Sequence, residues 1–378
     1  MKNKWKRTTS KTRKTLRFVK KKRSKGMSKK QKSPVMQDQR IQVHPPAEAP
    51  VTVEAQPRHI LVPVLQHIYV DDKHRRKLMD RKKLRILVVT PFTNTMDMQM
   101  EPLITEPLRI LVQEVVVLKT YEQVPTVLSQ MNPDLLLIIC QEEPMSDELL
   151  ITIQQTSVKT ALWNVGDHFV VDSIRHMVPY FDVVFTQNIM NIPIYQHLGC
   201  KNAVYLPLTA DRTMYSPKIT NKPFQSDLLL IGDYYPYRQE HLDTIQQISE
   251  LKKIFVLGED WEANERIILI EKDQDLQAYY NGANIIVNWK SIQQQVFEAA
   301  ACGAFQLVEE NPNLSAFMLP GEDVVTFRTP QEMRDQLRLY LDQPELKRKV
   351  ASKALWRSHY DYSSLHMAMR LLDGMFGI

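Results

Sequence analysis

One carboxylate stands out because of the residues that surround it. Glu298 is followed by three alanines, by Cys302 and by Gly303, and residues 305–308, which are mostly apolar, are suited to a strand. Alanine favours helix and glycine is common at a helix end, so the spacing predicts that Glu298 lies at the start of a short helix that leads into a buried strand. In an open α/β sheet ligands bind at the strand ends, where a carboxylate can accept hydrogen bonds from the hydroxyl groups of a ribose. A solvated glutamate on an ordinary helix is the alternative.

The elements that would position this carboxylate alternate along the chain. Apolar runs typical of buried parallel strands are separated by segments with helical spacing. The stretch from Leu84 to the carboxyl end has about 295 residues, which are too many for one ordinary core. The pattern therefore predicts the α/β class, with two doubly wound sheets. Predicted strands cover residues 84–90, 133–140, 159–164, 181–186, 203–207, 224–232, 254–258, 283–288 and 305–308. Predicted helices cover residues 189–198, 239–251, 331–341, 345–360 and 363–375.

The first 40 residues differ in charge from the rest of the chain. They hold 17 of the 49 Lys and Arg residues and one of the 43 Asp and Glu residues, which leaves 32 basic and 42 acidic residues and a formal charge of −10 for the remainder. The tail is expected to be disordered, and the Pro-rich residues that follow, up to 58, to be a linker. The tail can bind phosphate backbones, anionic lipid heads or an acidic surface, or serve only as a tether. A uniformly basic, nucleic-acid-binding body is not supported.

Several classes of protein are disfavoured by what the sequence lacks. The loop after the first predicted strand contains no Gly-x-Gly-x-x-Gly, so an NAD- or FAD-dependent dehydrogenase is not expected. Cys140, Cys200 and Cys302 lack metal-ligand spacing and are expected to be free, buried thiols. No apolar run reaches the length of about 18 residues that a membrane span needs, and no signal peptide follows the basic tail. The sequence therefore predicts a cytoplasmic protein without a transmembrane segment.

Six short motifs occur in an order that resembles one family. The motifs span residues 163–167, 181–186, 198–202, 206–211, 226–238 and 297–303. With these motifs, the chain from Leu84 to its carboxyl end is similar to the CgeB-type family, which is named for a spore maturation protein and treated as glycosyltransferases of the two-Rossmann GT-B architecture. The basic tail and the linker lie outside the resemblance.

The resemblance implies a fold and a reaction. The fold is GT-B, in which two Rossmann-like domains face a central cleft and a last helix crosses back to the first domain. The reaction transfers a sugar from a nucleotide diphosphate donor to a glycan, protein or spore-surface acceptor, without a cofactor, and association with the spore is implied. The predicted parts are the tail and linker (1–58), an extra segment (59–83), an acceptor domain (84–222), a donor domain (223–355) and the crossover helix (356–378).

The resemblance also implies a donor site. Glu298 would hold the ribose, with Gly303 in the same motif. Gly232 and Arg238 have the spacing at which related enzymes place a glycine and a basic residue that contacts the diphosphate, and a guanidinium suits bidentate phosphate contact. A solvent-exposed surface group is the alternative for Arg238. Lys290 can neutralise phosphate, or it is an ordinary loop cation.

Asp167 and His168 follow a predicted strand and are expected to face the cleft. Asp167 can accept the proton of the acceptor hydroxyl as a general base, or orient the acceptor sugar, with His168 assisting. Capping of the next helix is the alternative for Asp167. Helix amino ends can supply further donors for phosphates. The first domain has no Asp-x-Asp pair at a strand end, so no divalent metal ion is predicted.

Three positions depart from the family pattern. Many retaining GT-B enzymes have a second glutamate eight positions before the ribose glutamate, where this chain has Lys290. Gln295 stands where CgeB-like sequences tend to have a basic residue, and Gly166 where they have an acidic one. These differences favour the alternative of a non-catalytic GT-B-like module that binds glycan or protein in a spore or surface assembly. A nucleotide-sugar epimerase of the same architecture is a third hypothesis.

Overall fold

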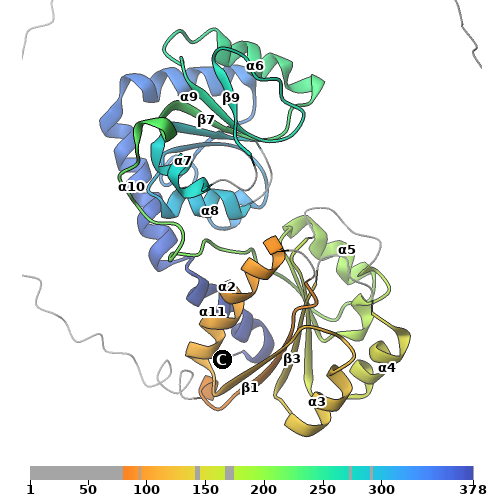
Figure 1. Cartoon of the computed structure of the whole chain (residues 1–378). Helices are drawn as coiled ribbons and strands as arrows, with labels where there is room; N and C mark the ends of the chain where they lie inside the picture. The colour runs from red at the N-terminus through yellow and green to blue at the C-terminus, as the bar shows by residue number, and fades with distance from the viewer. Residues whose placement is uncertain are drawn as a thin grey trace, which may run out of the picture. The chain divides into compact units, whose positions relative to one another are not determined.

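The computed structural model describes residues 80–92, 95–140, 145–166, 174–271, 275–289 and 293–377. These residues form two sheets of six strands each, and every pairing between neighbouring strands is parallel. Helices cover both faces of each sheet (Figure 1). The predicted α/β class and the two Rossmann-like sheets are confirmed.

The first sheet has the strand order β2-β1-β3-β4-β5-β6. Its strands are apolar because both faces are buried, which is how parallel strands read in sequence. The strands are β1 (Arg85–Val89), β2 (Glu114–Leu118), β3 (Leu135–Cys140), β4 (Lys159–Asn164), β5 (Val183–Thr186) and β6 (Ala203–Tyr205). The helices between them are α2 (Thr95–Leu111), α3 (Val124–Met131), α4 (Asp147–Gln155) and α5 (Ile192–His197), with 3-10 turns η2 (Val178–Tyr180) and η3 (Ile189–Asn191).

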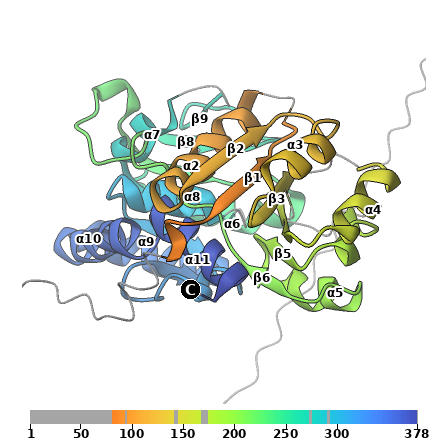
Figure 2. The ribbon, with the colours of Figure 1, turned by 90° about the horizontal axis from the view of Figure 1, so that it is seen from below.

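Side chains of β1 and β3 alternate between two cores. Ile86 and Leu137 belong to the core under α2, whereas Leu87 and Leu136 belong to the core under α3 and α4. Figure 2 shows β1 with α2 on one side and α3 on the other. The alternation follows from the two-residue period of a strand, and it makes a one-residue slip in register costly.

The second sheet has the strand order β12-β11-β10-β7-β8-β9. Renumbered from its own first strand, this is the 3-2-1-4-5-6 order of a dinucleotide-binding Rossmann sheet. The strands are β7 (Ser226–Ile231), β8 (Ile254–Leu257), β9 (Ile267–Leu269), β10 (Ala283–Asn288), β11 (Gln306–Glu309) and β12 (Val325–Phe327). The connecting helices are α6 (Gln239–Gln246), α7 (Leu276–Gly282), α8 (Gln293–Ala301) and α9 (Pro330–Asp342), with 3-10 turns η4 (Lys222–Phe224), η5 (Pro236–Arg238) and η6 (Leu314–Ala316).

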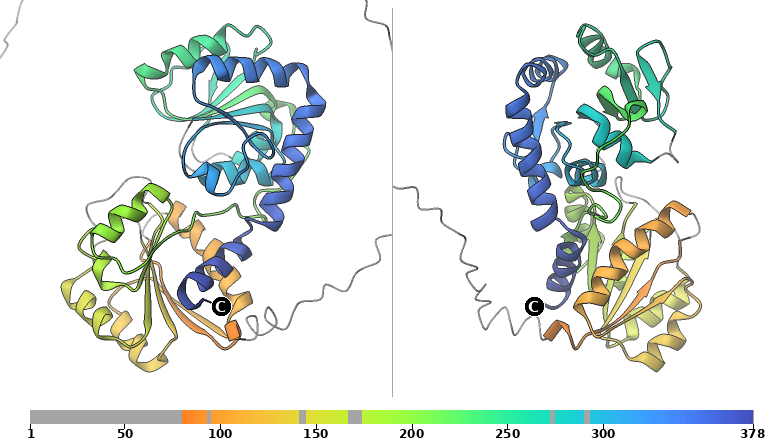
Figure 3. Two further views of the ribbon diagram at one scale, coloured as in Figure 1. Left: turned by 180° about the vertical axis from the view of Figure 1, so that it is seen from behind. Right: turned by 60° about the vertical axis from the view of Figure 1, so that its left-hand side comes forward.

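The chain ends in α10 (Pro344–Tyr360) and α11 (Ser364–Phe376), which pack on different sheets (Figure 3). Val350 and Ala351 of α10 lie in a core of the second sheet, whereas Leu371 and Leu372 of α11 lie in a core of the first. Ser363 begins α11, since its hydroxyl accepts a hydrogen bond from the amide of His366. The helix α11 therefore packs on the first sheet, although it follows the second sheet in the sequence.

Some predicted bounds need correction. The helix predicted over 239–251 ends at Gln246, because the guanidinium of Arg266 binds the carbonyls of Gln246, Ile248 and Leu251 and holds that segment in a turn. Strands β2, β9 and β12 were not predicted. Strands β9 and β12 have only three residues each and lie at the sheet edges, where too few residues alternate to give a pattern.

Two further predictions concern the cysteines and the membrane. Cys140, Cys200 and Cys302 are buried thiols that form no disulfide, as predicted. No helix in the described part of the chain combines the length and the apolar character that a bilayer crossing requires. The tail (1–58) lies outside the described residues, and so does most of the segment 59–83. The predicted domain bounds stay a prediction.

Candidate functional site

Topology marks a ligand-binding edge on each sheet, and the predicted donor residues lie on the second sheet. In doubly wound sheets ligands bind outside the carboxyl ends of the strands, where the strand order reverses. Here the order reverses between β7 and β10, which are neighbours. Gly232 follows β7 directly and Trp289 follows β10 directly. The predicted diphosphate residues Gly232 and Arg238 therefore belong to the loop that leaves this switch point.

Gly232 is in close contact with the side chain of Trp289. A methyl group at Gly232 would lie 2.1 Å from Cδ1 of Trp289, so no larger residue fits there. The indole N–H of Trp289 donates to the carbonyl of Asp233 at 3.2 Å, and that of Trp261 donates to the carbonyl of Gly232 at 2.8 Å. The indole of Trp289 is 5% exposed. Packing against this indole is a sufficient reason for a glycine here, and the predicted phosphate contact stays untested.

Arg238 ends the turn η5 and forms a bidentate ion pair with Glu309, the last residue of β11. Its Nη1 lies 2.5 Å from Oε1 of Glu309 and its Nη2 lies 2.7 Å from Oε2. The side chains are 11% and 28% exposed, so Arg238 is not the solvated surface group of the alternative interpretation. Burial alone would lower the pKa of Arg238, but the hydrogen bonds and the attraction to Glu309 outweigh burial and raise it.

His241, on the first turn of α6, lies beside this pair. It is 8% exposed, and neither ring nitrogen has a hydrogen-bond partner within the described residues. Its ring packs edge-on to Trp289 at 5.7 Å between centroids. Burial and then the nearby charge of Arg238 lower the pKa of His241. The ring is therefore neutral at pH 7, and Arg238 and Glu309 are the charged members of this group.

Glu298 is the sixth residue of α8, not at the helix start as predicted, because the three glutamines before Val296 also favour helix. It is 5% exposed. The hydroxyl of Tyr280 donates to its Oε2 at 3.0 Å, and Tyr215 and Gln294 also hydrogen-bond to the carboxylate. Burial raises the pKa of Glu298 from near 4.5 to about 7, although these hydrogen bonds act to lower it. The carboxylate is neither surface-exposed nor short of partners.

The end of α8 explains two further residues of the motif. Gly303 has φ +72°, the left-handed conformation that ends many helices, and a methyl group there would make only ordinary contacts with Leu355 and Pro217. Burial raises the pKa of Cys302 to about 12, so this thiol is not a nucleophile at neutral pH. Helix termination is therefore sufficient reason for Gly303, and its place in a donor site stays a prediction.

Three predicted site residues, Asp167, His168 and Lys290, lie outside the described residues. Sequence reasoning did not single out Trp289, Glu309 or the tyrosines that bind Glu298. Glu309 had a detectable signal, because a carboxylate at the carboxyl end of a buried parallel strand lies at the ligand-binding edge. The tyrosine contacts join residues that are far apart in the sequence, so no local pattern could reveal them.

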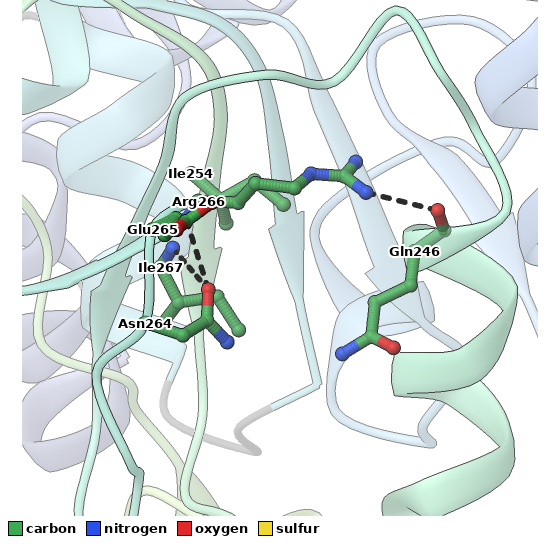
Figure 4. Close-up of a pocket in the computed structure, with 6 residues that line it drawn as sticks. All are labelled: Gln246, Ile254, Asn264, Glu265, Arg266 and Ile267. Atoms are coloured by element: carbon green, nitrogen blue, oxygen red, sulfur yellow. Dashed lines mark hydrogen bonds between the residues drawn. The ribbon is translucent and has the colours of Figure 1, made fainter.

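A surface pocket lies at the opposite end of the second sheet (Figure 4). Ile254 and Ile267, the first residues of β8 and β9, line it together with Arg266. Asn264 accepts hydrogen bonds from the amides of Arg266 and Ile267 and shapes the turn between the two strands. Because these are amino ends of strands, the pocket is separate from the switch-point residues.

Comparison with known proteins relates this chain to glycosyltransferase-like sequences. Residues 238–373 match the model of the Glycosyl transferase-like family. That stretch contains Arg238, Glu298 and Glu309. The chain is also similar to Spore protein CgeB of Bacillus subtilis (strain 168), with 22% identity over 249 residues that cover 58% of this chain and 76% of that protein. The predicted resemblance to CgeB-type proteins is thereby confirmed.

Solved structures share the fold. A glycosyltransferase from Rickettsia africae ESF-5 superposes with a TM-score of 0.57 and 11% identity, over 77% of this chain and 97% of that one. Anabaena Alr3699/HepE in complex with UDP-glucose superposes with a TM-score of 0.55 and 9% identity, over 78% of this chain and 100% of that one. The two sheets therefore have the arrangement of strands and helices that GT-B glycosyltransferases use.

Proposed function

We propose that this protein is a glycosyltransferase that moves a sugar from a nucleotide diphosphate donor to a glycan, protein or spore-surface acceptor without a metal ion. The observation that carries the proposal is the match of residues 238–373 to a glycosyltransferase family, on a sheet of Rossmann strand order. Similarity to a spore protein supports a spore-surface acceptor, and the structure of HepE with UDP-glucose supports a nucleotide-sugar donor. The basic tail would contact an anionic surface.

The donor would occupy the carboxyl edge of the second sheet. Arg238 would contact the diphosphate, together with backbone amides at the amino end of α6 and the ammonium group of Lys290. Glu298 would bind the ribose hydroxyls, exchanging hydrogen bonds that it now receives from tyrosines. Asp167 would accept the proton of the acceptor hydroxyl as that oxygen bonds to the anomeric carbon and the nucleoside diphosphate leaves, with His168 assisting.

Metal independence is part of the proposal because side chains supply the positive charge. A leaving diphosphate needs charge stabilisation, which a divalent cation or cationic residues can provide. Arg238 ends the turn η5 after β7, and Lys290 follows the last residue of β10 by two positions in the sequence. Donor hydrolysis or transfer should therefore continue unchanged in EDTA, and a requirement for added Mg²⁺ or Mn²⁺ would contradict this part of the proposal.

The test is a thermal-shift screen of the full chain against UDP, GDP and ADP, followed by hydrolysis of the matching sugar nucleotides. A ligand at 100 times its Kd stabilises a protein by about 2.7 kcal/mol, which such a screen detects. Glu298→Ala should abolish the shift. Glu250→Ala, which removes an exposed carboxylate near the amino end of β8, is the matched control and should leave the shift unchanged. The proposal fails if no nucleotide diphosphate stabilises the protein.

A non-catalytic binding module is a second candidate, and a specific observation favours it. Arg238 is already paired with Glu309, Gly232 is covered by Trp289, and Glu298 receives hydrogen bonds from Tyr280. In a site without catalytic turnover, the side chains are free to bind one another in this way instead of a substrate. A nucleotide that stabilises the fold while no sugar nucleotide is hydrolysed or transferred would support the module over the enzyme.

A further inference from the structure

Glu309 occupies the two terminal nitrogens of Arg238, which a phosphate would need for a bidentate contact. The two terminal nitrogens of a guanidinium form a planar fork of N–H groups that matches one carboxylate or one phosphate at a time. Both terminal nitrogens of Arg238 point at Glu309, at 2.5 and 2.7 Å. A phosphate that uses the same fork must therefore replace the carboxylate.

The surroundings keep Arg238 where it is during such an exchange. The guanidinium carbon lies 5.2 Å from the ring centre of Tyr237 and 5.4 Å from that of Trp289, so aromatic rings flank it. Its Nε is buried without a hydrogen-bond partner within the described residues. Glu309 differs, because its side chain is 28% exposed and can turn to water at small cost. The carboxylate, and not the guanidinium, is the group that can move.

We propose that Glu309 is a specificity-determining residue that competes with the donor diphosphate for Arg238. This inference rests on the proposed function. The ion pair has no net charge, so a ligand gains from Arg238 only by displacing Glu309, and its phosphates then lie close to a second negative charge. A diphosphate has enough charge to compete, whereas a nucleoside without phosphate gains nothing from the exchange. Glu309 therefore weakens the binding of anionic ligands in proportion to their charge.

The test is Glu309→Gln, with affinities measured by isothermal titration calorimetry on the full chain. The probes are UDP, GDP, ADP, inorganic pyrophosphate and uridine. We expect at least tenfold tighter binding of pyrophosphate and of the nucleoside diphosphate that binds the wild type, and less than a twofold change for uridine.

A matched control lies one residue away. Glu310 forms the same kind of pair with Arg328, at 2.6 and 2.7 Å, so Glu310→Gln changes the net charge equally without touching Arg238. We expect Glu310→Gln to change affinity less than twofold. Equal gains from both variants would show a general charge effect and overturn the proposal.

A double-mutant cycle separates the pair from either residue alone. Arg238→Gln should weaken diphosphate binding at least tenfold, and in the double variant Glu309→Gln should give a smaller gain than it gives in the wild type. If Glu309→Gln does not fold, Glu309→Asp retains the charge but shortens the reach, and should tighten binding about threefold. Binding that Glu309 variants leave unchanged or weaken would refute the competition while leaving the proposed function intact. No binding to the wild type or to any variant would refute both.

Discussion

Glu298 should make the free energy of unfolding of the protein depend on pH. The carboxyl group has a pKa near 4.5 in an ordinary setting and about 7 in the folded protein, chiefly because it is buried. The folded state therefore holds the proton more tightly than the unfolded chain. Between these two values the free energy of unfolding falls as the pH rises, and above pH 7 the full penalty is present.

The size of the effect follows from the shift. At about 1.4 kcal/mol per pKa unit, the rise from near 4.5 to about 7 corresponds to roughly 3 kcal/mol. Glu298→Gln removes the ionisable group but retains an oxygen that can accept from Tyr280. The variant should match the wild type near pH 4.5 and be more stable by about 3 kcal/mol at pH 8, where the wild type carries a buried charge.

Urea unfolding of both proteins from pH 4.5 to pH 8.5 measures this difference. Glu262→Gln, an exposed glutamate in the loop after β8, is the control and should follow the wild type at every pH. Tyr280→Phe removes a hydrogen bond that favours the ionised form, so its loss of stability should be larger at pH 8 than at pH 5. A wild-type-to-Glu298→Gln difference that does not change with pH would refute the reasoning.

Three other substitutions separate packing from ligand binding, each measured by urea unfolding. Gly232→Ala drives a methyl group into Trp289 and should lower the free energy of unfolding by about 3 kcal/mol or more. At Gly303→Ala the added methyl group makes only ordinary contacts, so the left-handed backbone is the main cost and about 1–2 kcal/mol is expected. A loss as large as that at Gly232 would contradict the packing argument. Leu372→Ala opens a cavity between α11 and the first sheet and should cost about 2–5 kcal/mol, whereas a loss below 1 kcal/mol would mean that α11 is not held there.

Most of the fold could be predicted because buried parallel strands have an unmistakable composition. Residues 135–140 and 228–231 are continuous apolar runs entered from polar sequence, and both lie in strands. Helix ends were harder to place, since the end of α6 depends on Arg266, which lies 20 residues away. Strand β2 is five residues of mostly β-branched character, and it was missed although its composition favours a strand.

The candidate site was predicted less completely than the fold. Motif spacing singled out Arg238 and Glu298 as candidates, but it did not predict that each would already have a partner inside the protein. Those partners, Glu309 and Tyr280, come from other elements, and their meeting depends on the strand order of the sheet and on the packing of α7 against α8. Spacing along one segment contains no information on either. The sequence therefore points to candidate chemical groups, whereas their hydrogen-bond partners and burial are visible only in the tertiary structure.

The existing partners of Arg238 and Glu298 affect how tightly a donor can bind. A nucleotide that enters the proposed site replaces existing contacts, so only the difference between new and old contacts appears as affinity. At Arg238 a phosphate gains over Glu309 only through its extra charge, and at Glu298 a ribose hydroxyl replaces a tyrosine hydroxyl of equal bonding capacity. The nucleoside diphosphate alone should then bind weakly, and the donor sugar must supply the remaining affinity through contacts of its own. An enzyme of this design would release its diphosphate product readily.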